Sequence, residues 1–311
     1  MSLNGNCSTD IFPDVVRIES SGKCNFKCLH CSHAQKDHLR PNLSYEIFNK
    51  ILSQFEYKNF IPRVVVLYHG GEPLLNKNIF NFIKDLKSYG VKFTRIVSNA
   101  ALLTQEIIEK LIDAGLDEIS FSFDGLSPEE NNAIRRNGNF ERDSQNVINF
   151  LNTVRKRKSN IRVKIANVQF YEKRELKNHM TNNENKKMPN YILEKFHKYP
   201  EIIYESHPAM VWPGFDIKSS IFSICKSNVK SPDYCPSAFE TISILSNGDI
   251  VPCCYDICGE KVFGNVLNDN IFEIWKNKEY GAFRNAIKGS NPDNFCKKCL
   301  VYSGEYLVKT C

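Results

Sequence analysis

Short runs of β-branched and aromatic residues alternate with amphipathic stretches over the first two thirds of the chain. Such runs, bounded by turn-forming residues, are typical of buried β-strands. The six runs cover residues 15–20, 63–69, 91–98, 116–123, 161–168 and 201–206. Because strands that alternate with helices form parallel sheets with right-handed crossovers, the pattern predicts an α/β fold with a parallel sheet.

The stretches between these runs carry apolar residues at helical spacing. One apolar face follows Ser44 and a second follows Thr104, and both residues are favourable N-caps. Six βα units are too few for a closed eight-stranded barrel, so we expect a partial (β/α)6 barrel. Active sites of such sheets lie at the carboxyl ends of the strands.

The pattern changes after residue 215. Short strands around residues 241–254 and one helix through residues 270–287 are expected to make a small, cysteine-rich region. Residues 179–190 are interpreted as a polar loop before the last βα unit. We therefore expect a barrel domain over residues 1–206, a linker over 207–224 and a second domain over 225–311.

Composition and charge are those of an ordinary soluble globular protein. The 311 residues are 42% hydrophobic and 24% charged, and no apolar run has the length of a membrane span. The first ten residues lack a signal-peptide pattern, so we expect a cytoplasmic protein without a membrane partner. The densest basic run, residues 155–164, is interpreted as a helix end leading into a strand; without interleaved aromatic residues, it does not indicate nucleic-acid binding.

The chain has twelve cysteines, and so many in a protein of a reducing compartment indicate that they have a role. Apart from Cys7, three lie within residues 24–31 and eight lie from residue 225 onward. Thiolate-bound metal explains this clustering better than disulfides, and the split indicates two metal-bearing regions.

Cys24, Cys28 and Cys31 have the spacing C-x3-C-x2-C directly after the first predicted strand. A [4Fe–4S] cluster takes one thiolate for each iron, so three cysteines leave one iron open to another ligand. A zinc site would need a fourth ligand, for which His30 and His33 are candidates. The spacing favours the cluster over zinc.

The triad and the motifs that follow it resemble the radical S-adenosylmethionine (SAM) superfamily. "HGGEP" follows the second strand, "SNAA" the third, and "SFSFDG" forms the fourth. The resemblance implies that SAM binds the open iron of a [4Fe–4S] cluster. One electron then cleaves SAM to methionine and a 5′-deoxyadenosyl radical, which abstracts hydrogen from a substrate.

The resemblance also implies a set of SAM contacts. Gly70 and Gly71 would let backbone approach the methionine part, Glu72 would accept from its ammonium, and Arg135 would pair with its carboxylate. Ala100 stands where relatives carry glycine. The implied SAM-binding residues are His30, Gly70, Gly71, Glu72, Asn99, Ser122 and Arg135.

The C-terminal cysteines resemble the SPASM iron–sulfur extension of this superfamily, in its shortened "twitch" form. Glu305 and Lys309 occupy positions that are cysteines in the full domain, so we expect one closed auxiliary [4Fe–4S] cluster. Its implied ligands are Cys235, Cys253, Cys296 and Cys299. A structural zinc ribbon is the alternative. Cys225, Cys254, Cys258 and Cys311 are left without an assigned role.

These resemblances imply a radical SAM oxidoreductase or epimerase. About a dozen residues precede the first strand, too few for a leader-binding domain, which favours a sugar-like small molecule over a short peptide as substrate. The alternatives are a peptide-modifying maturase and, from another class, a non-catalytic iron–sulfur electron carrier or sensor. A reducing partner such as flavodoxin or ferredoxin is implied.

Overall fold

The computed structural model describes residues 11–36, 40–176, 187–226 and 233–309. Cys7, Cys311 and most of the polar loop expected at 179–190 lie outside the described residues. Among the helices in the described ranges, none combines the length and apolar character needed to cross a bilayer.

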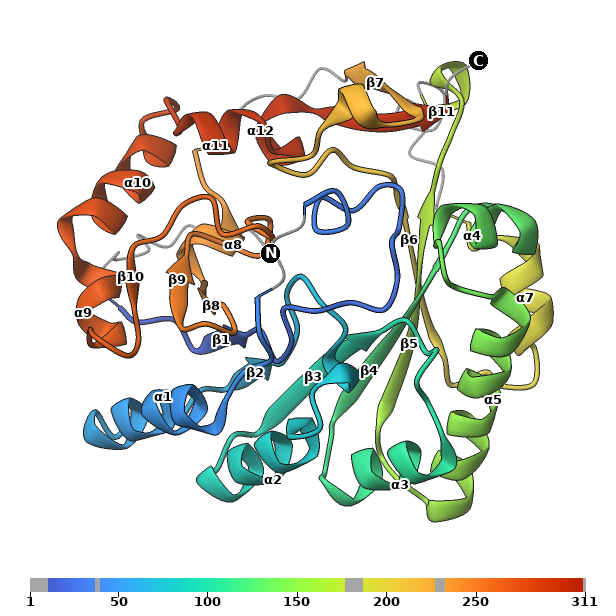
Figure 1. The fold of residues 1–311 in the computed structure, drawn as a ribbon, viewed down its shortest axis with the longest axis horizontal. Coiled ribbons are helices and arrows are strands. Elements are labelled where there is room, and N and C mark those ends of the chain that lie inside the picture. Colours follow the sequence, from blue (N-terminus) through green and yellow to red (C-terminus); the bar gives the residue numbers. More distant parts are fainter. Residues whose placement is uncertain (1–10, 37–39, 177–186, 227–232, 310–311) are drawn as a thin grey trace.

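Six parallel strands form the barrel wall, and each pairs with the next strand along the chain (Figure 1). This arrangement confirms the predicted partial barrel. Each observed strand lies in or next to the predicted run, with ends that shift by a few residues. The strands are β1 (Val15–Ile18), β2 (Val64–Val66), β3 (Phe93–Ser98), β4 (Glu118–Asp124), β5 (Arg162–Gln169) and β6 (Ile203–Pro208).

Helices cover the outer face of this wall, as Figure 1 shows for α1, α2, α3 and α5. The predicted N-caps are confirmed, because Ser44 accepts from the Ile47 amide and Thr104 from the Ile107 amide. A 3-10 turn, η1 (Pro73–Leu75), follows β2. The helices are α1 (Tyr45–Tyr57), α2 (Ile79–Tyr89), α3 (Gln105–Asp113), α4 (Pro128–Ile134), α5 (Phe140–Arg157) and α7 (Asn190–Phe196).

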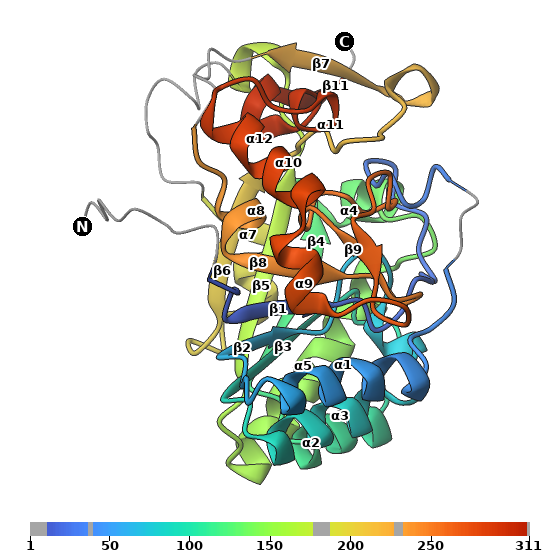
Figure 2. The same ribbon diagram turned by 90° about the vertical axis from the view of Figure 1, so that its left-hand side faces the viewer.

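The C-terminal region continues the barrel sheet. Strand β8 (Thr241–Ile244) pairs in parallel with β1, with Val15 opposite Thr241, so that β10, β9 and β8 extend the wall to nine strands (Figure 2). Strands β9 (Asp249–Val251) and β10 (Gly264–Asn265) complete this edge. One hydrophobic core runs through both regions. The domain boundaries given above stay a prediction.

The expected single helix over residues 270–287 is two helices, α9 (Ile271–Lys276) and α10 (Lys278–Lys288). Asn277 separates them: its backbone is extended, and its side chain accepts from the Tyr280 amide as the N-cap of α10. Hydrophobic spacing alone missed this break, because both helices present apolar residues to the same core.

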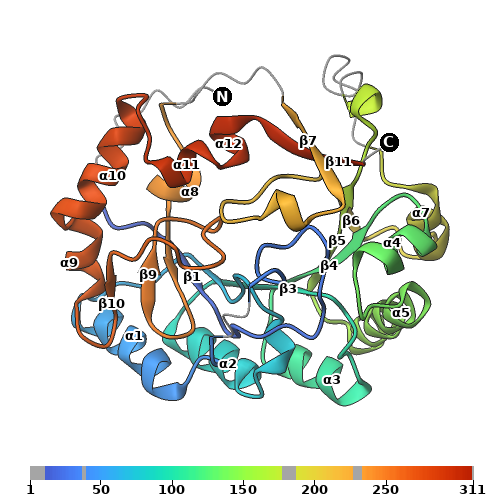
Figure 3. The same ribbon diagram turned by 45° about the horizontal axis from the view of Figure 1, so that its top comes forward.

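The remaining elements are a two-stranded ribbon and short helical segments. Strands β7 (Phe222–Lys226) and β11 (Glu305–Lys309) form an antiparallel ribbon. Figure 3 shows the ribbon beside the ends of β5 and β6, where the Leu307 amide donates to the Ala209 carbonyl at 2.9 Å. The short elements are η2 (Ile217–Ser219), α8 (Pro236–Phe239), α11 (Asn294–Lys297) and α12 (Leu300–Ser303).

Candidate functional site

The loop after β1 carries the cysteine triad and lies among the loops that follow the other strands (Figure 1). The Glu72 amide donates to the Lys23 carbonyl at 2.8 Å, which ties the turn after β2 to this loop. On the opposite side, the Leu29 amide donates to the Ile134 carbonyl at 3.0 Å. Backbone contacts therefore fix the triad loop at both ends.

The three triad thiols lie in one partly buried environment. Burial is the main reason that the pKa of Cys24 is raised to about 11 and that of Cys28 to about 12. The charge of Cys31 raises both values further, and that of Cys24 also raises the Cys28 value, so the thiols are close enough to interact. Free thiolates are disfavoured here, and a cation that binds all three would offset that cost.

The triad fits a cluster better than zinc. Within the described ranges, no three His, Cys, Asp or Glu side chains converge tightly enough to enclose one metal ion. A zinc ion holds its thiolates at about 2.3 Å, whereas a cluster spreads them over different irons. His33, a candidate fourth zinc ligand, instead contacts the Gly22 carbonyl at 2.8 Å through Nε2. The cysteines' role as ligands stays a prediction.

The two glycines after β2 allow a close approach between protein segments. A Cβ atom on Gly71 would lie 2.2 Å from the Ser21 carbonyl oxygen and 2.4 Å from that of Lys23. The Gly70 amide donates to Glu19 Oε1 at 3.1 Å. The sequence indicated close approach to SAM; in the structure, Gly71 is required for packing against the triad loop.

Glu72 is a buried carboxylate with three protein donors. Ser98 Oγ donates to Oε1 at 2.9 Å, the Leu74 amide to Oε1 at 3.2 Å and the Asn99 amide to Oε2 at 2.8 Å. Burial raises the Glu72 pKa, and these donors partly counteract it. A carboxylate has about four acceptor sites, so Glu72 retains capacity for another donor.

Asn99 joins the turn after β3 to the triad loop. Its Nδ2 donates to Asn25 Oδ1 at 2.7 Å, next to Cys24 in sequence. Ala100, which replaces the expected glycine, has a φ of +67° and is fully buried. The left-handed turn forms without glycine, at the strain cost of an L side chain in that region.

Arg135 and His30 meet at Asp124, a residue that the sequence analysis did not single out. Arg135 Nη1 donates to Asp124 Oδ2 at 3.0 Å, and its guanidinium lies over the Phe26 ring. His30 Nε2 lies 3.9 Å from the same oxygen, and burial lowers the His30 pKa. Neither Asp124 Oδ1 nor His30 Nδ1 has a hydrogen-bond partner among the described residues.

The alternation of β4 could have identified Asp124. Ser122, a predicted SAM contact, is partly buried, and side chains two residues apart on a strand point to the same face. Ser120, Ser122 and Asp124 therefore line one face. The predicted strand ends at residue 123, whereas β4 extends to Asp124.

A second ion pair missed by the sequence analysis links the barrel to the C-terminal region. Glu19, at the end of β1, is fully buried and accepts from Arg40 Nε and Nη2, both at 2.8 Å. Ser246 Oγ donates to the same carboxylate at 3.0 Å. Burial acts to raise the Glu19 pKa, but Arg40 outweighs it and holds the pKa below its ordinary value.

His69 makes a parallel connection beside this pair. Its Nε2 lies 2.9 Å from the Asp256 carbonyl oxygen, which requires a proton on Nε2. Burial lowers the His69 pKa to about 4. The C-terminal region is thus attached to the barrel in two ways: by polar contacts with the turn after β2 and by the pairing of β8 with β1.

The four predicted auxiliary ligands are buried, each between 5% and 8% exposed. Burial raises the Cys299 pKa to about 12, with a further rise from Cys235 and Cys254. The pKa of Cys253 is also raised, first by burial and then by the charges of Cys254, Cys299 and Cys235. The structure brings the set together and places Cys254 beside it, and the choice of ligands stays a prediction.

Two of the unassigned cysteines lie elsewhere. Cys225 is buried on β7 and packs with Leu176 and Val308. Burial raises the Cys258 pKa, which the Lys36 charge and a hydrogen bond with Ser32 partly counteract. Cys258 therefore lies beside the segment that directly follows the triad.

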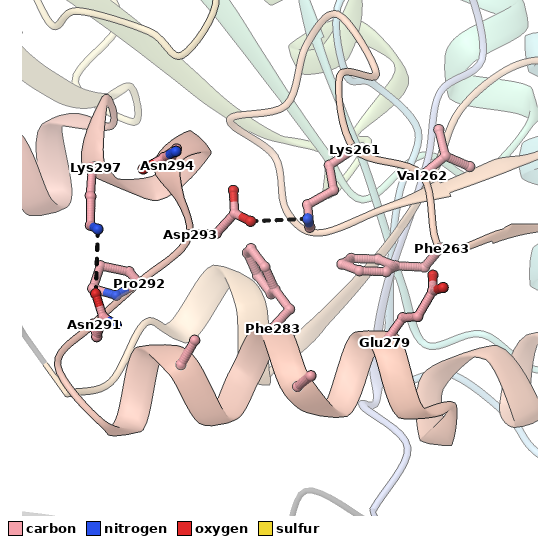
Figure 4. A pocket seen from close by; sticks show the side chains of 12 residues that line it. Lys261, Val262, Phe263, Glu279, Phe283, Asn291, Pro292, Asp293, Asn294 and Lys297 are labelled. Atoms are coloured by element: carbon pink, nitrogen blue, oxygen red, sulfur yellow. Dashed lines mark hydrogen bonds and ion pairs between the residues drawn. The ribbon is translucent and has the colours of Figure 1, made fainter.

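A hollow of about 710 Å³ lies on the C-terminal region (Figure 4). Lys261 spans it toward Asp293, with Nζ at 3.0 Å from Oδ2, and the Phe263 and Phe283 rings lie near Lys261. None of its lining residues is a predicted SAM contact. The hollow and the predicted SAM contacts are therefore formed by different residues.

Two curated relatives match over less than half of this chain. The probable GTP 3′,8-cyclase of Methanocaldococcus jannaschii is 31% identical over 127 residues, which are 41% of this chain and 42% of that protein. The PqqA peptide cyclase of Bradyrhizobium diazoefficiens is 30% identical over 115 residues, 37% of this chain and 29% of that protein. The chain thus spans less than half the length of these relatives.

Solved structures match over nearly the whole chain, at identities that show the fold alone. BtrN in complex with AdoMet and 2-DOIA gives a TM-score of 0.57 at 16% identity, covering 93% of this chain and 94% of BtrN. Streptococcus suis SuiB bound to precursor peptide SuiA also gives 0.57, at 17% identity, covering 94% of this chain and 70% of SuiB.

Family models account for both metal-bearing regions. The radical SAM superfamily model matches residues 18–177, more than half of the chain, and the SPASM model, an iron–sulfur cluster-binding domain, matches residues 235–300. The first covers the triad and every predicted SAM contact, and the second covers the four buried cysteines. The chain therefore belongs to the radical SAM superfamily, with a SPASM domain at its C-terminal end.

Proposed function

We propose that this enzyme abstracts hydrogen from a C–H bond of a sugar-like small molecule and oxidises the adjoining alcohol to a carbonyl. The substrate would lose a hydrogen atom from carbon, a proton from the hydroxyl, and one electron that passes to the auxiliary cluster. The observation that carries the proposal is the junction at Glu19, which Arg40 and Ser246 share. It attaches the SPASM domain directly to the strand that leads into the triad.

The cofactors supply the hard step: SAM bound at the open iron of a [4Fe–4S] cluster yields the species that abstracts hydrogen. Cys24, Cys28 and Cys31 would hold that cluster. Cys235, Cys253, Cys296 and Cys299 would hold the auxiliary one. With no thiol position left for an outside ligand, the auxiliary cluster would exchange electrons rather than bind SAM.

The protein's own contribution is to orient SAM. Glu72 would accept from the SAM ammonium with its remaining acceptor capacity. Arg135 commits Nη1 to Asp124 and retains other donors of its five for the SAM carboxylate. Asp124 would hold the guanidinium in place, since a charge-assisted bond at 3.0 Å fixes its plane.

The preference for a small molecule rests on the fold shared with BtrN. The structure of BtrN was solved in complex with AdoMet and 2-DOIA, and the alignment with this chain covers 94% of BtrN. The alternative is a peptide substrate, which the names of two relatives favour: a PqqA peptide cyclase and SuiB bound to precursor peptide SuiA.

Epimerisation is the second candidate outcome, and Cys258 favours it. A thiol beside Ser32 and Lys36 lies close to the triad segment and would return a hydrogen atom to the substrate carbon. The thiyl radical left behind would be reduced by one electron from the auxiliary cluster and would take a proton from solvent. Turnover in D2O distinguishes the outcomes, because a thiol exchanges its hydrogen with solvent. Epimerisation would place deuterium on carbon and stop in Cys258→Ala, whereas oxidation would place none.

The test of the proposal is turnover by the anaerobically reconstituted chain with SAM and dithionite. We expect 5′-deoxyadenosine, with deuterium incorporated from a small molecule of a deuterated cell extract. Label from a peptide fraction alone would support the maturase instead. Absence of 5′-deoxyadenosine under reducing conditions, with both clusters present, would leave the electron carrier or sensor as the better assignment.

A further inference from the structure

A second hollow, of about 540 Å³, lies at the amino ends of the barrel strands. Val64, Phe93 and Ile203 supply its apolar lining. Its charged lining comes from the starts of β2 to β5 and the segments before them: Arg63, Lys92, Arg95, Glu118, Arg162 and Lys164. Five cationic side chains thus surround a single carboxylate.

Glu118 does not neutralise its neighbours by direct hydrogen bonds. It is 5% exposed and lies 3.8 Å from Arg95, 3.7 Å from Arg162 and 3.6 Å from Lys164. These separations exceed the length of a charge-assisted hydrogen bond, about 2.7–2.9 Å. The three cations therefore keep most of their donors for another acceptor.

Aromatic residues hold two of these cations in position. Arg95 Nη2 donates to Tyr68 Oη at 2.9 Å, while its buried Nε has no partner among the described residues. The Arg162 guanidinium lies 4.4 Å from the centre of the Phe93 ring. Such prior ordering reduces the entropy lost when a ligand binds.

Two more carboxylates adjoin the hollow, but they do not neutralise its positive charge. Asp14 pairs with Arg63 at 2.7 Å, and Glu205 pairs with Lys164 at 2.9 Å. Together with Glu118 they leave an excess of positive charge. Arginine forks match phosphate oxygens, and the volume is that of a small-molecule pocket.

We infer that this hollow binds the phosphoryl group of a small molecule. The site is separate from the proposed reaction: β4 runs from Glu118 at the hollow to Asp124 at the barrel mouth, about 20 Å at the usual rise per residue. It also gives a role to part of the basic run at residues 155–164. Arg155 and Arg157 pair with Glu201 and Asp113, while Arg162 lines the hollow.

Isothermal titration of the reconstituted full chain with inorganic pyrophosphate, at low ionic strength, tests the inference. We expect saturable binding at one site. Arg162→Gln should weaken it about tenfold or more, the usual effect of losing a hydrogen bond to a charged group. Arg162 is 54% exposed, so the substitution should not disturb folding.

Glu118→Gln is the more discriminating variant. It removes the one carboxylate of the lining, and with it the repulsion of an anion, so pyrophosphate should bind more tightly. A merely structural role for Glu118 would give no gain. Arg157→Gln is the matched control: this arginine pairs with Asp113 at 2.7 Å, outside the hollow, and its loss should leave the affinity unchanged.

Three results would overturn the inference: no saturable heat at millimolar pyrophosphate, equal weakening by Arg157→Gln and Arg162→Gln, or weaker binding in Glu118→Gln. SAM affinity measured in the same samples separates this site from the proposed function. We expect it to be unchanged in all three variants, whether or not the chain oxidises a sugar.

Discussion

At the scale of single residues, the site consists of charged groups that the protein has already paired. Glu72 accepts three protein donors, and Arg135 is bound to Asp124. These partners fix the position of each charge before the proposed binding of SAM. Prior ordering of this kind lowers the entropic cost of binding and makes the loss of either charge expensive.

Glu72→Gln and Arg135→Gln should each weaken SAM binding, by about 2–5 kcal/mol, because one charge of a partly desolvated pair is removed. Equilibrium binding of SAM to the anaerobic protein measures the effect, and iron content shows whether the cluster is retained. Glu106→Gln, on the exposed face of α3, is the control and should change neither. Unchanged SAM affinity in both site variants would remove these residues from the site.

His69 should make the folded state less stable in mild acid. Its pKa is about 4 in the folded protein, mainly through burial, against about 6.5 when unfolded. Between these values the unfolded chain binds more protons, so stability falls as the pH drops from 6.5 toward 4, by up to about 3 kcal/mol. Urea unfolding at several pH values measures this dependence.

His69→Gln should reduce that pH dependence, because glutamine can still donate to the Asp256 carbonyl and does not titrate. His197→Gln, at an exposed position, is the matched control and should leave the slope as in the parent protein. If the free energy of unfolding depended on pH equally in the parent and in His69→Gln, protonation of His69 would not destabilise the folded state, and the prediction would be wrong.

At the scale of elements, the helix boundary at Asn277 depends on one side chain. Its oxygen caps α10 at the Tyr280 amide, and its Nδ2 donates to the Phe263 carbonyl at 3.1 Å. Asn277→Ala should lower the free energy of unfolding by about 1 kcal/mol, the typical value of an N-cap. Asn285→Ala, on the exposed face of the same helix, should cost nothing; equal urea midpoints for the two variants would contradict the capping role.

The strands and helices of the barrel could be predicted because their signals are local. Ser44 and Thr104 cap helices through amides three residues away. Strand alternation could have placed Asp124 on the face of Ser122, but the partners of Glu19 and Asp124 could not be found in this way. Glu19 meets Ser246, 227 residues further along the chain, and Asp124 acquires its role only when Arg135 and His30 fold against it. The pairing of β8 with β1 was missed for the same reason.

At the scale of the whole molecule, two sets of thiolates should hold two clusters. The reconstituted chain should carry about eight irons and little zinc, four for each cluster. A triple alanine variant of Cys24, Cys28 and Cys31 should retain about four irons, and so should a double alanine variant of Cys296 and Cys299. Metal analysis of the three proteins measures these values.

Two outcomes of that analysis would contradict the assignment. Zinc in place of iron in the triple variant would make the C-terminal region a structural ribbon. About twelve irons in the parent protein would mean that further cysteines complete a third cluster. In the second case, Cys254, which lies beside the four predicted auxiliary ligands, would be the first additional candidate.

The parallel pairing of β1 with β8 also constrains how the chain can fold. Strand β1 is synthesised well before β8, its partner along one edge, which lies more than 220 residues further along the chain. Until that partner is synthesised, β1 presents a row of unpaired amides and carbonyls, the usual starting point of aggregation. A nascent or truncated barrel without the SPASM domain would therefore be open on the side that leads into the triad, and prone to self-association there.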